Sequence, residues 1–147
     1  MQVFTIASST GRPVWVLAPA FVVVAIAIGV LVLVSLASRS ARFEVSSEGL
    51  RLRGDLYGRF VPTGALEIDK AHRVDFGASP ELLPARRTMG TGLPGYQSGW
   101  FRLKNGEKAL LYLTDRTKAV YVPTTEGYGL LLSPDDPDGF LGALAAR

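Results

Sequence analysis

Cysteine is absent from this sequence of 147 residues, and histidine occurs only once. Without cysteine, the chain forms no disulfide and offers no thiolate to a metal ion or a substrate. Strong charge of one sign is also missing, because lysine and arginine exceed aspartate and glutamate by only three. Proteins that hold nucleic acid neutralise many phosphates with basic side chains. We therefore predict no nucleic-acid partner, while the lack of cysteine leaves the redox compartment open.

Residues 13–37 contain no charged side chain, and 21 of these 25 residues are apolar. A helix of this length spans about 37 Å, enough to cross a hydrocarbon core of about 30 Å. The segment is rich in valine and isoleucine, but in lipid a single segment satisfies its backbone only as a helix. We predict a transmembrane helix over residues 13–37, with Trp15 as an interface anchor and residues 1–12 as a short tail. The lipid bilayer is thus the first predicted partner.

A cleaved signal peptide is the alternative for this segment, because residues 35–37 have the small-x-small pattern of a cleavage site. Against it, the apolar run is much longer than the usual core of about 7–15 residues. In addition, Arg12 is the only basic side chain before the run. Arg39 and Arg42 follow it closely, so the positive-inside rule predicts that the C-terminal part faces the cytoplasm.

The same two arginines begin a predicted membrane-surface site. Arg39 and Arg42 lie within five residues of the apolar run, so a spanning helix places them among the lipid headgroups. The cytoplasmic leaflet is anionic and attracts arginines near it. Arg51 and Arg53 join the site if the first predicted hairpin lies flat against the bilayer; otherwise they belong to a solvated strand face.

Residues 38–41 are predicted to form a linker, and residues 42–147 a globular domain. From residue 42 apolar residues recur at every second position, as they do in half-buried strands. Glycine and proline are frequent in residues 77–99, which are predicted to be a long loop. The expected strands lie around residues 43–45, 50–52, 57–61, 100–103, 109–114, 119–123 and 128–132, with further short strands at 66–68 and 74–76.

One hairpin can be predicted with its register. A two-residue turn at Asn105 and Gly106 would put Phe101 and Leu111 on opposite faces. A three-residue loop over residues 104–106 instead pairs Phe101 with Ala109 and gathers the apolar side chains on one face. We predict this second register, with Gly106 in the left-handed conformation, because a slip of one residue would expose the whole apolar set.

The chain is predicted to end in an amphipathic helix. Ser133 is a suitable N-cap, and Pro134 suits the first helical position. Phe140, Leu141 and Leu144 form an apolar stripe at helical spacing. About seven strands followed by one helix predict a small, partly open barrel that the helix closes at one end.

Three separated motifs in this part of the chain resemble those of the bacterial pleckstrin-homology-like (PH-like) domains. The resemblance covers roughly residues 42–145 and implies a mainly β (α+β) fold. In this fold a seven-stranded antiparallel barrel or sandwich is capped by a C-terminal helix, and transmembrane helices are often attached. It implies no enzyme activity and no agreed ligand. The motifs are Arg-Thr-Met-Gly-Thr-Gly-Leu-Pro-Gly-Tyr at 87–96 with Gly-Trp-Phe at 99–101, Tyr-Leu-Thr-Asp at 112–115, and Leu-Ser-Pro-Asp-Asp-Pro at 132–137 with Phe140.

No group of residues in the sequence predicts catalysis, a cofactor or a metal. Residues 90–95 match G-x-G-x-x-G, but a dinucleotide site needs a strand before this motif and a helix that starts within it. His72 lacks further nitrogen or sulfur ligands nearby, and no activated serine accompanies it. The aspartates at 135, 136 and 138 lack the loop of a calcium site and suit a helix N-terminus instead. We therefore predict that the protein is not an enzyme.

The remaining candidates are surface residues that a protein partner would contact. Tyr96 and Trp100 are aromatic, and Arg86 and Arg87 lie in the predicted loop beside them. We predict a single-pass protein of the bacterial inner membrane that presents a binding or scaffold module to the cytoplasm. Its partner would be a protein, a peptide or the membrane surface. The first alternative is a structural subunit that forms a homo-oligomer through exposed strand edges, and the second is an enzyme.

Overall fold

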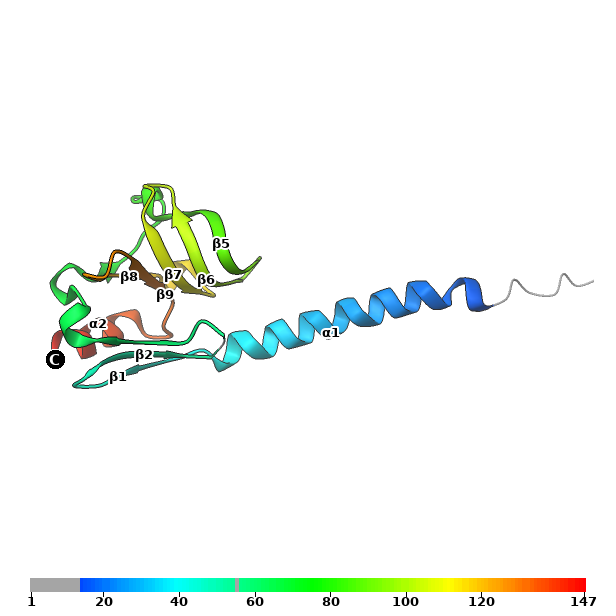
Figure 1. Cartoon of the computed structure of the whole chain (residues 1–147), viewed down its shortest axis with the longest axis horizontal. Helices are drawn as coiled ribbons and strands as arrows, with labels where there is room; N and C mark the ends of the chain where they lie inside the picture. The colour runs from blue at the N-terminus through cyan, green and yellow to red at the C-terminus, as the bar shows by residue number, and fades with distance from the viewer. Residues whose placement is uncertain (1–13, 55) are drawn as a thin grey trace, which may run out of the picture. The chain divides into compact units, whose positions relative to one another are not determined.

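The computed structural model describes residues 14–54 and 56–147 (Figure 1). The chain divides into two compact units, the first ending at Ser35 and the second running from Leu36 to Arg147. The predicted tail, residues 1–12, and Pro13 lie outside the described residues.

The long helix α1 covers Ala18–Ser40 and follows a single 3-10 turn, η1, at Val14–Val16. Within it, Ala18–Leu36 is long and apolar enough to cross a membrane, and none of this stretch is buried in the protein. Because the helix is near the N-terminus, the same length and composition also fit a signal sequence. The helix continues to Ser40 and therefore includes most of the predicted linker.

A three-stranded antiparallel sheet follows, with β1 at Arg42–Val45, β2 at Gly49–Arg53 and β3 at Arg59–Pro62. Apolar and charged residues alternate in β1 and β2, and because side chains alternate across a strand, one face of the sheet is mainly apolar and the other is mainly charged. Leu50, Leu52 and Val61 are buried on the inner face, while the arginines of β1 and β2 lie on the outer face.

The second sheet has six strands in the order β4-β8-β9-β7-β6-β5. β9 lies between β7 and β8, and it runs parallel to β7 and antiparallel to β8. This parallel pair departs from the all-antiparallel arrangement that the sequence predicts. The strands are β4 at His72–Arg73, β5 at Pro84–Leu93, β6 at Tyr96–Leu103, β7 at Lys108–Leu113, β8 at Val120–Pro123 and β9 at Gly129–Leu132.

The prediction of a long loop over residues 77–99 is wrong. Most of this region forms β5 and the start of β6, which pair along their length. The error has a physical cause, because Gly90 and Gly99 stand where the two strands come too close for side chains. Gly95 has a φ of +78°, the left-handed value that a Pro-Gly turn needs at its second central residue.

Two of the short strands predicted before this region also differ. Ile68–Lys70 forms a 3-10 turn (η3), and Leu66 makes only an isolated bridge to Thr124. The strand expected at 74–76 is replaced by β4 just before it. The other 3-10 turns are η2 at Thr63–Ala65, η4 at Pro80–Leu82 and η5 at Arg116–Lys118.

The predicted β6–β7 register is confirmed, because Phe101 pairs with Ala109 across a loop at residues 104–106. Gly106 has the expected left-handed φ of +88°. The apolar side chains of one face are buried together, as the register required: Phe101, Leu103, Ala109, Leu111 and Leu113.

The C-terminal helix is present, but it begins later than predicted. α2 covers Pro137–Ala145, and Asp136 is its N-cap, with a side-chain oxygen that accepts a hydrogen bond from the Gly139 N–H at 3.0 Å. Pro137, not Pro134, occupies the first turn. Phe140 and Leu144 are buried, so the predicted apolar stripe is confirmed.

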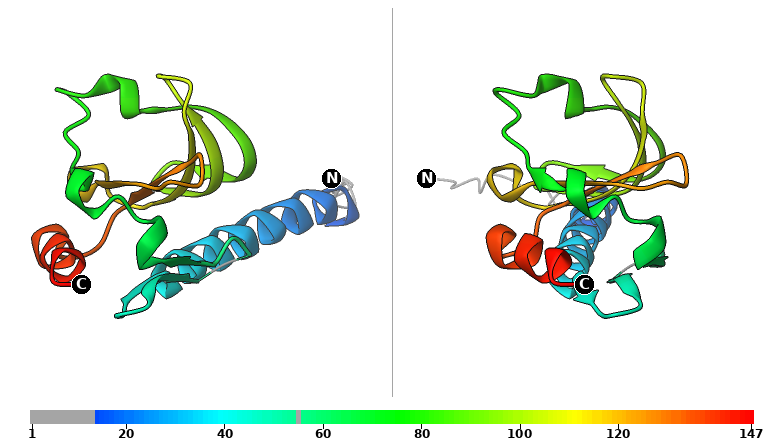
Figure 2. Two further views of the ribbon diagram at one scale, coloured as in Figure 1. Left: turned by 60° about the vertical axis from the view of Figure 1, so that its left-hand side comes forward. Right: turned by 90° about the vertical axis from the view of Figure 1, so that its left-hand side faces the viewer.

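The six-stranded sheet is covered on both faces. One face packs against the small sheet and α2, and the other packs against residues 74–83. Figures 1 and 2 show the two sheets as separate layers, with α2 beside the small sheet. The predicted PH-like sandwich with a C-terminal helix is therefore confirmed. The described residues form nine strands in two sheets and not a closed barrel of seven.

Candidate functional site: a groove along the edge of β1

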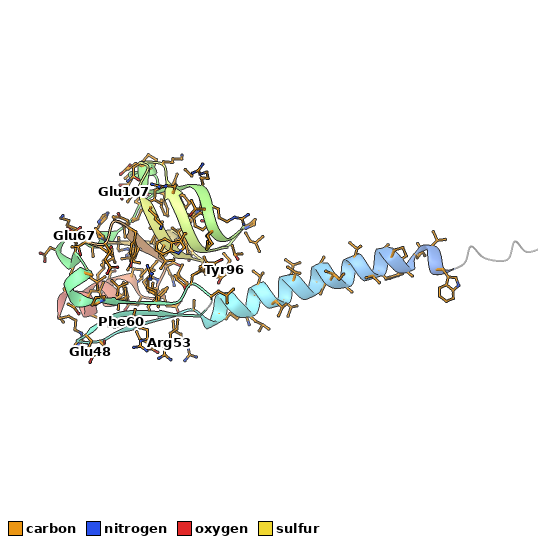
Figure 3. The ribbon with its side chains drawn as sticks, viewed as in Figure 1. Glu48, Arg53, Phe60, Glu67, Tyr96 and Glu107 are labelled. Atoms are coloured by element: carbon orange, nitrogen blue, oxygen red, sulfur yellow. The ribbon has the colours of Figure 1, made fainter. Side chains whose placement is uncertain are left out.

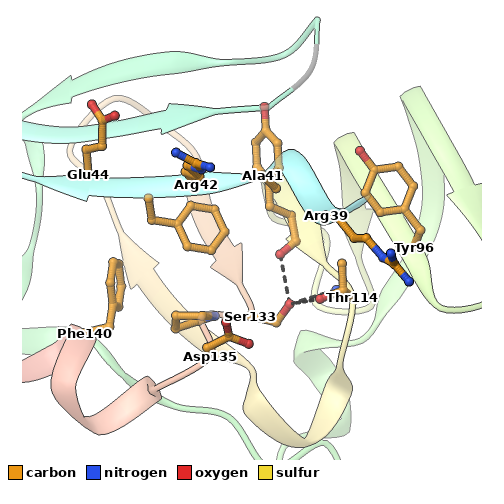
Figure 4. A pocket seen from close by; sticks show the side chains of 12 residues that line it. Arg39, Ala41, Arg42, Glu44, Tyr96, Thr114, Ser133, Asp135 and Phe140 are labelled. Carbon is orange, nitrogen blue, oxygen red and sulfur yellow. Dashed lines mark hydrogen bonds between the residues drawn. The ribbon is translucent and has the colours of Figure 1, made fainter. Parts of the chain in front are cut away.

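A groove of about 770 Å³ runs along β1 on the side away from β2 (Figure 4). All of its residues belong to the unit that begins at Leu36. β1 forms one wall, and the chain between β9 and α2 forms the opposite wall. The lining consists of Arg39, Ala41, Arg42, Phe43, Glu44, Tyr96, Tyr112, Thr114, Ser133, Pro134, Asp135 and Phe140.

Aromatic rings form the apolar part of this groove. The Phe43 ring meets the Tyr112 ring edge-on at 6.1 Å between centroids, and the Phe140 ring also at 6.1 Å. Tyr112 and Phe140 are buried, and Phe43 is half-buried. Phe43 is on the inner face of β1 because it alternates with Arg42 and Glu44, which are exposed.

Hydrogen bonds to Ser133 fix the opposite wall. Its hydroxyl oxygen accepts a hydrogen bond from the Thr114 N–H at 2.8 Å and lies 2.9 Å from the Thr114 hydroxyl. The Ser133 N–H donates to the Tyr112 carbonyl at 3.0 Å. Ser133 therefore joins the end of β7 to the chain before α2, and it does not cap the helix as predicted.

The backbone N–H and C=O of Phe43 take no part in the pairing of β1 with β2. Ser46 and Gly49 exchange both backbone hydrogen bonds at the turn. In an antiparallel pair such exchanges occur at every second residue pair. Glu44 therefore bonds with Arg51, whereas the N–H and C=O of Phe43 point away from β2. β1 is an edge strand of its sheet, so this side of it carries no further strand among the described residues.

Charge differs along the groove. Arg39 lies beside Tyr96 at one end, and Glu44 lies toward the other end (Figure 4). Glu44 is also 3.3 Å from Arg53, and Asp135 is 3.8 Å from Lys118. These carboxylates are largely exposed, so their ion pairs stabilise the fold little and leave them accessible to a ligand.

The four arginines of the predicted membrane-surface site are placed in two groups. Arg39 and Arg42 line the groove. Arg51 and Arg53 lie with Arg42 on the outer face of the small sheet, where Arg42 pairs directly with Arg53. Figure 3 shows Arg53 on this face. The Arg51 guanidinium lies 5.5 Å from the centre of the exposed Phe60 ring.

The four residues of the predicted partner surface do not come together. Tyr96 is buried and lines the groove. Arg86 and Arg87 are exposed on β5.

Trp100, the fourth, belongs to a separate cluster. Its ring lies 5.3 Å from the Arg59 guanidinium, 4.3 Å from the Lys108 ammonium and 5.1 Å from the Tyr128 ring. The two cations lie over the ring, and Trp100 does not line the groove.

Several polar groups outside the groove have structural partners. The Tyr121 hydroxyl donates to Glu107 at 2.6 Å, and burial together with this carboxylate raises the pKa of Tyr121 well above its usual range. His72 is exposed, with its Nδ1 2.9 Å from the Lys70 carbonyl oxygen. Residues 90–95 lie in the β5–β6 hairpin, with a strand and not a helix after them. Across residues 14–54 and 56–147, no three His, Asp or Glu side chains gather as metal ligands would.

Several groove residues were missed by the sequence analysis, which assigned no binding role to Phe43, Thr114, Ser133, Asp135 or Phe140. The Ser-Pro-Asp-Asp sequence at 133–136 was a visible signal, but it was interpreted as a helix start. No local pattern reveals that β1 is an edge strand, because that depends on which strands pair.

Comparison with known proteins supports the fold directly. The family model described as the bacterial PH domain matches residues 41–147. This range contains both sheets, α2 and every groove residue except Arg39. No curated protein and no solved structure matches the chain. The predicted family resemblance is therefore confirmed over nearly the whole second unit.

Proposed function

The chain belongs to the bacterial PH domain family, and we propose that it acts as a non-catalytic binding and scaffold module anchored to the membrane. In this proposal the groove along β1 receives an extended segment of a partner protein. Helix α1 holds the module at the membrane, with the domain in the cytoplasm, because Arg39 and Arg42 follow the apolar stretch.

The free edge of β1 beside an aromatic groove is the observation that carries this proposal. Extended peptides bind edge strands by adding a strand, with backbone hydrogen bonds for affinity and side-chain pockets for specificity. The N–H and C=O of Phe43 supply the hydrogen bonds, and the rings of Phe43, Tyr112 and Phe140 supply an apolar surface. The strand edge available for pairing is β1, Arg42–Val45, which matches a peptide of about four residues at 3.3 Å per residue.

The groove also indicates the kind of segment that it takes. Side chains of an added strand alternate between the groove and solvent, so apolar residues are expected at every second position. Arg39 and Arg42 at one end favour an acidic residue there, and Glu44 at the other favours a basic one. We therefore propose a short partner segment with alternating apolar residues and opposite charges at its two ends.

Peptide display on the full-length protein in lipid nanodiscs tests the proposal, with empty nanodiscs as counter-selection. We expect enriched peptides with the alternating pattern, and we expect Thr114→Trp to weaken their binding at least about tenfold by filling the groove. Thr114 is exposed and lines the groove. Thr125→Trp is the matched control, because Thr125 is an exposed threonine in the β8–β9 turn and does not line the groove.

Two results would contradict the proposal. The first is that no peptide is enriched over empty nanodiscs. The second is that Thr114→Trp and Thr125→Trp bind the selected peptide equally well, since the binding surface would then lie elsewhere. Thermal unfolding of both variants shows whether a loss of binding comes from the groove or from a loss of fold.

Self-assembly is a second candidate function, and the exposed edge of β5 favours it. Pro84 and two register irregularities before Met89 protect the first half of this edge from pairing. The second half, Met89–Leu93, is uncharged and exposes Met89 at 62 %. Mass photometry of the detergent-solubilised protein distinguishes the two functions, because assembly through β5 gives discrete oligomers that Thr91→Lys reduces to monomers.

A further inference from the structure

We propose that two loop tips of the domain enter the interfacial layer of the bilayer next to the point where α1 joins the domain. The first tip carries Leu56, in the turn between β2 and β3. The second is Leu93-Pro94-Gly95, the turn between β5 and β6. This inference rests on the proposed anchoring by α1.

Leu56 is the most exposed large apolar side chain among the described residues, with 96 % of its surface accessible. Its position follows from the strand register. Arg42 pairs with Arg53, so the turn after Arg53 lies at the end of the small sheet where the chain arrives from α1. A single exposed leucine is common on protein surfaces. What distinguishes Leu56 is its position at the end of the small sheet where the chain arrives from α1.

The β5–β6 turn lies at the same end of the domain. Tyr96 lines the groove together with Arg39 and Ala41, and Leu93 is the cross-strand partner of Tyr96. Leu93 and Pro94 are exposed. The hairpin around them contains no charged residue from Thr88 to Phe101, so nothing in the tip itself opposes entry into an apolar layer.

Arginines lie near the β5–β6 tip and along the groove beside it. Arg116 lies in a hollow of about 460 Å³ with the β5–β6 turn, and Arg39 and Arg42 lie on the groove side. All three arginines are exposed. Of the acids near the tips, Asp55 directly precedes Leu56 in the sequence and stands between Arg53 and Arg59. Asp115 accepts a hydrogen bond from the Thr117 hydroxyl at 2.6 Å, and Asp135 lies 3.8 Å from Lys118. Apolar tips with arginines near them suit the membrane interface, where acyl chains lie just below anionic phosphates.

The length of the chain brings this end of the domain to the bilayer surface. The candidate span ends at Leu36, and the three helical residues to Arg39 rise only about 4.5 Å. By contrast, the β1–β2 turn at Ser47 lies about 17 Å further along the sheet, five residues from Arg42. In the end-on contact that we propose, Leu56 lies in the interface and Ser47 lies in water.

Because the protein has no cysteine, single cysteines can carry a fluorophore in the full-length chain. Four variants are needed: Leu56→Cys and Pro94→Cys at the tips, Ser47→Cys as the exposed control on the same sheet, and Ile26→Cys in α1. The labelled proteins are reconstituted into vesicles of phosphatidylcholine and phosphatidylglycerol that contain spin-labelled lipids. We expect shallow spin labels to quench the two tip probes at least threefold more than the Ser47 probe.

Each outcome has one meaning. If the Ile26 probe is not quenched by deep spin labels, α1 is not in the bilayer, and the anchoring proposal fails together with this one. If Ile26 is quenched but either tip is quenched no more than Ser47, the proposed insertion is wrong while the anchor stands. Equal strong quenching at Ser47 and Leu56 would show that the sheet lies flat on the membrane, which also overturns the end-on contact.

Discussion

At the scale of single residues, the β5–β6 hairpin depends on two glycines that face each other. Gly90 and Gly99 are cross-strand partners, with φ values of +147° and +108°. A Cβ atom at Gly99 would lie 2.5 Å from the Met89 carbonyl oxygen and 2.6 Å from the Gly90 Cα. Both neighbours are backbone atoms and cannot move aside, so neither the conformation nor the space admits a side chain.

Gly99→Ala is therefore expected to lower the free energy of unfolding by about 2–4 kcal/mol, from backbone strain and overpacking together. Gly92→Ala is the matched control in the same hairpin, because its nearest neighbour would be the Phe101 ring at 3.6 Å, an ordinary contact. This second change should stay within about 1 kcal/mol of the parent. Urea denaturation in mild detergent measures both. Equal losses of unfolding free energy would mean that the close approach of the two strands does not require glycine at position 99.

The two hairpins that contain β6 show what can and cannot be predicted from residues. The β6–β7 register follows from the sequence because only one alignment buries Phe101, Leu103 and Leu111 on one face. The β5–β6 pairing does not, because its glycines have no side chains whose alternation would reveal a strand. Glycine frequency indicates a loop equally well, and only the backbone contacts between Gly90 and Gly99 distinguish the two.

At the scale of elements, the start of α2 is decided by one of two adjacent aspartates. The Asp136 carboxylate accepts a hydrogen bond from the Gly139 N–H, whereas the Asp135 side chain is fully exposed and lies 3.8 Å from Lys118. Asp136→Ala is expected to destabilise the protein by about 1 kcal/mol, the usual effect of removing an N-cap. Asp135→Ala should change the stability by less than about 0.5 kcal/mol. Thermal unfolding of the two variants side by side checks this, and the reverse order would mean that the helix starts earlier.

Strand order is the part of the fold that the sequence leaves open. Gly129–Leu132 is recognisable as a buried strand because it is apolar and follows a turn. Nothing in those four residues says that they insert between β7 and β8 and run parallel to β7. The groove depends on the same long-range choices, since it combines residues near 40, 96, 112 and 133 that meet only after both sheets have formed.

At the scale of the whole molecule, the proposed orientation can be tested at the C-terminus. Arg39 and Arg42 follow the apolar stretch, and Arg12 is the only basic side chain before it. The charge difference favours a cytoplasmic domain. A fluorescent protein that folds only in the cytoplasm, fused after Arg147, should therefore fluoresce. Activity of a periplasm-only phosphatase at the same position would reverse the orientation.

The most direct test of the account is amide hydrogen exchange along β1, measured by NMR on the full-length protein with and without a display-selected peptide. The N–H of Phe43 points away from β2, whereas Arg42 and Glu44 already bond with β2. Strand addition should slow exchange at Phe43 at least about tenfold and leave its two neighbours nearly unchanged. If a bound peptide slows exchange elsewhere and leaves Phe43 as it was, the edge of β1 is not the binding site.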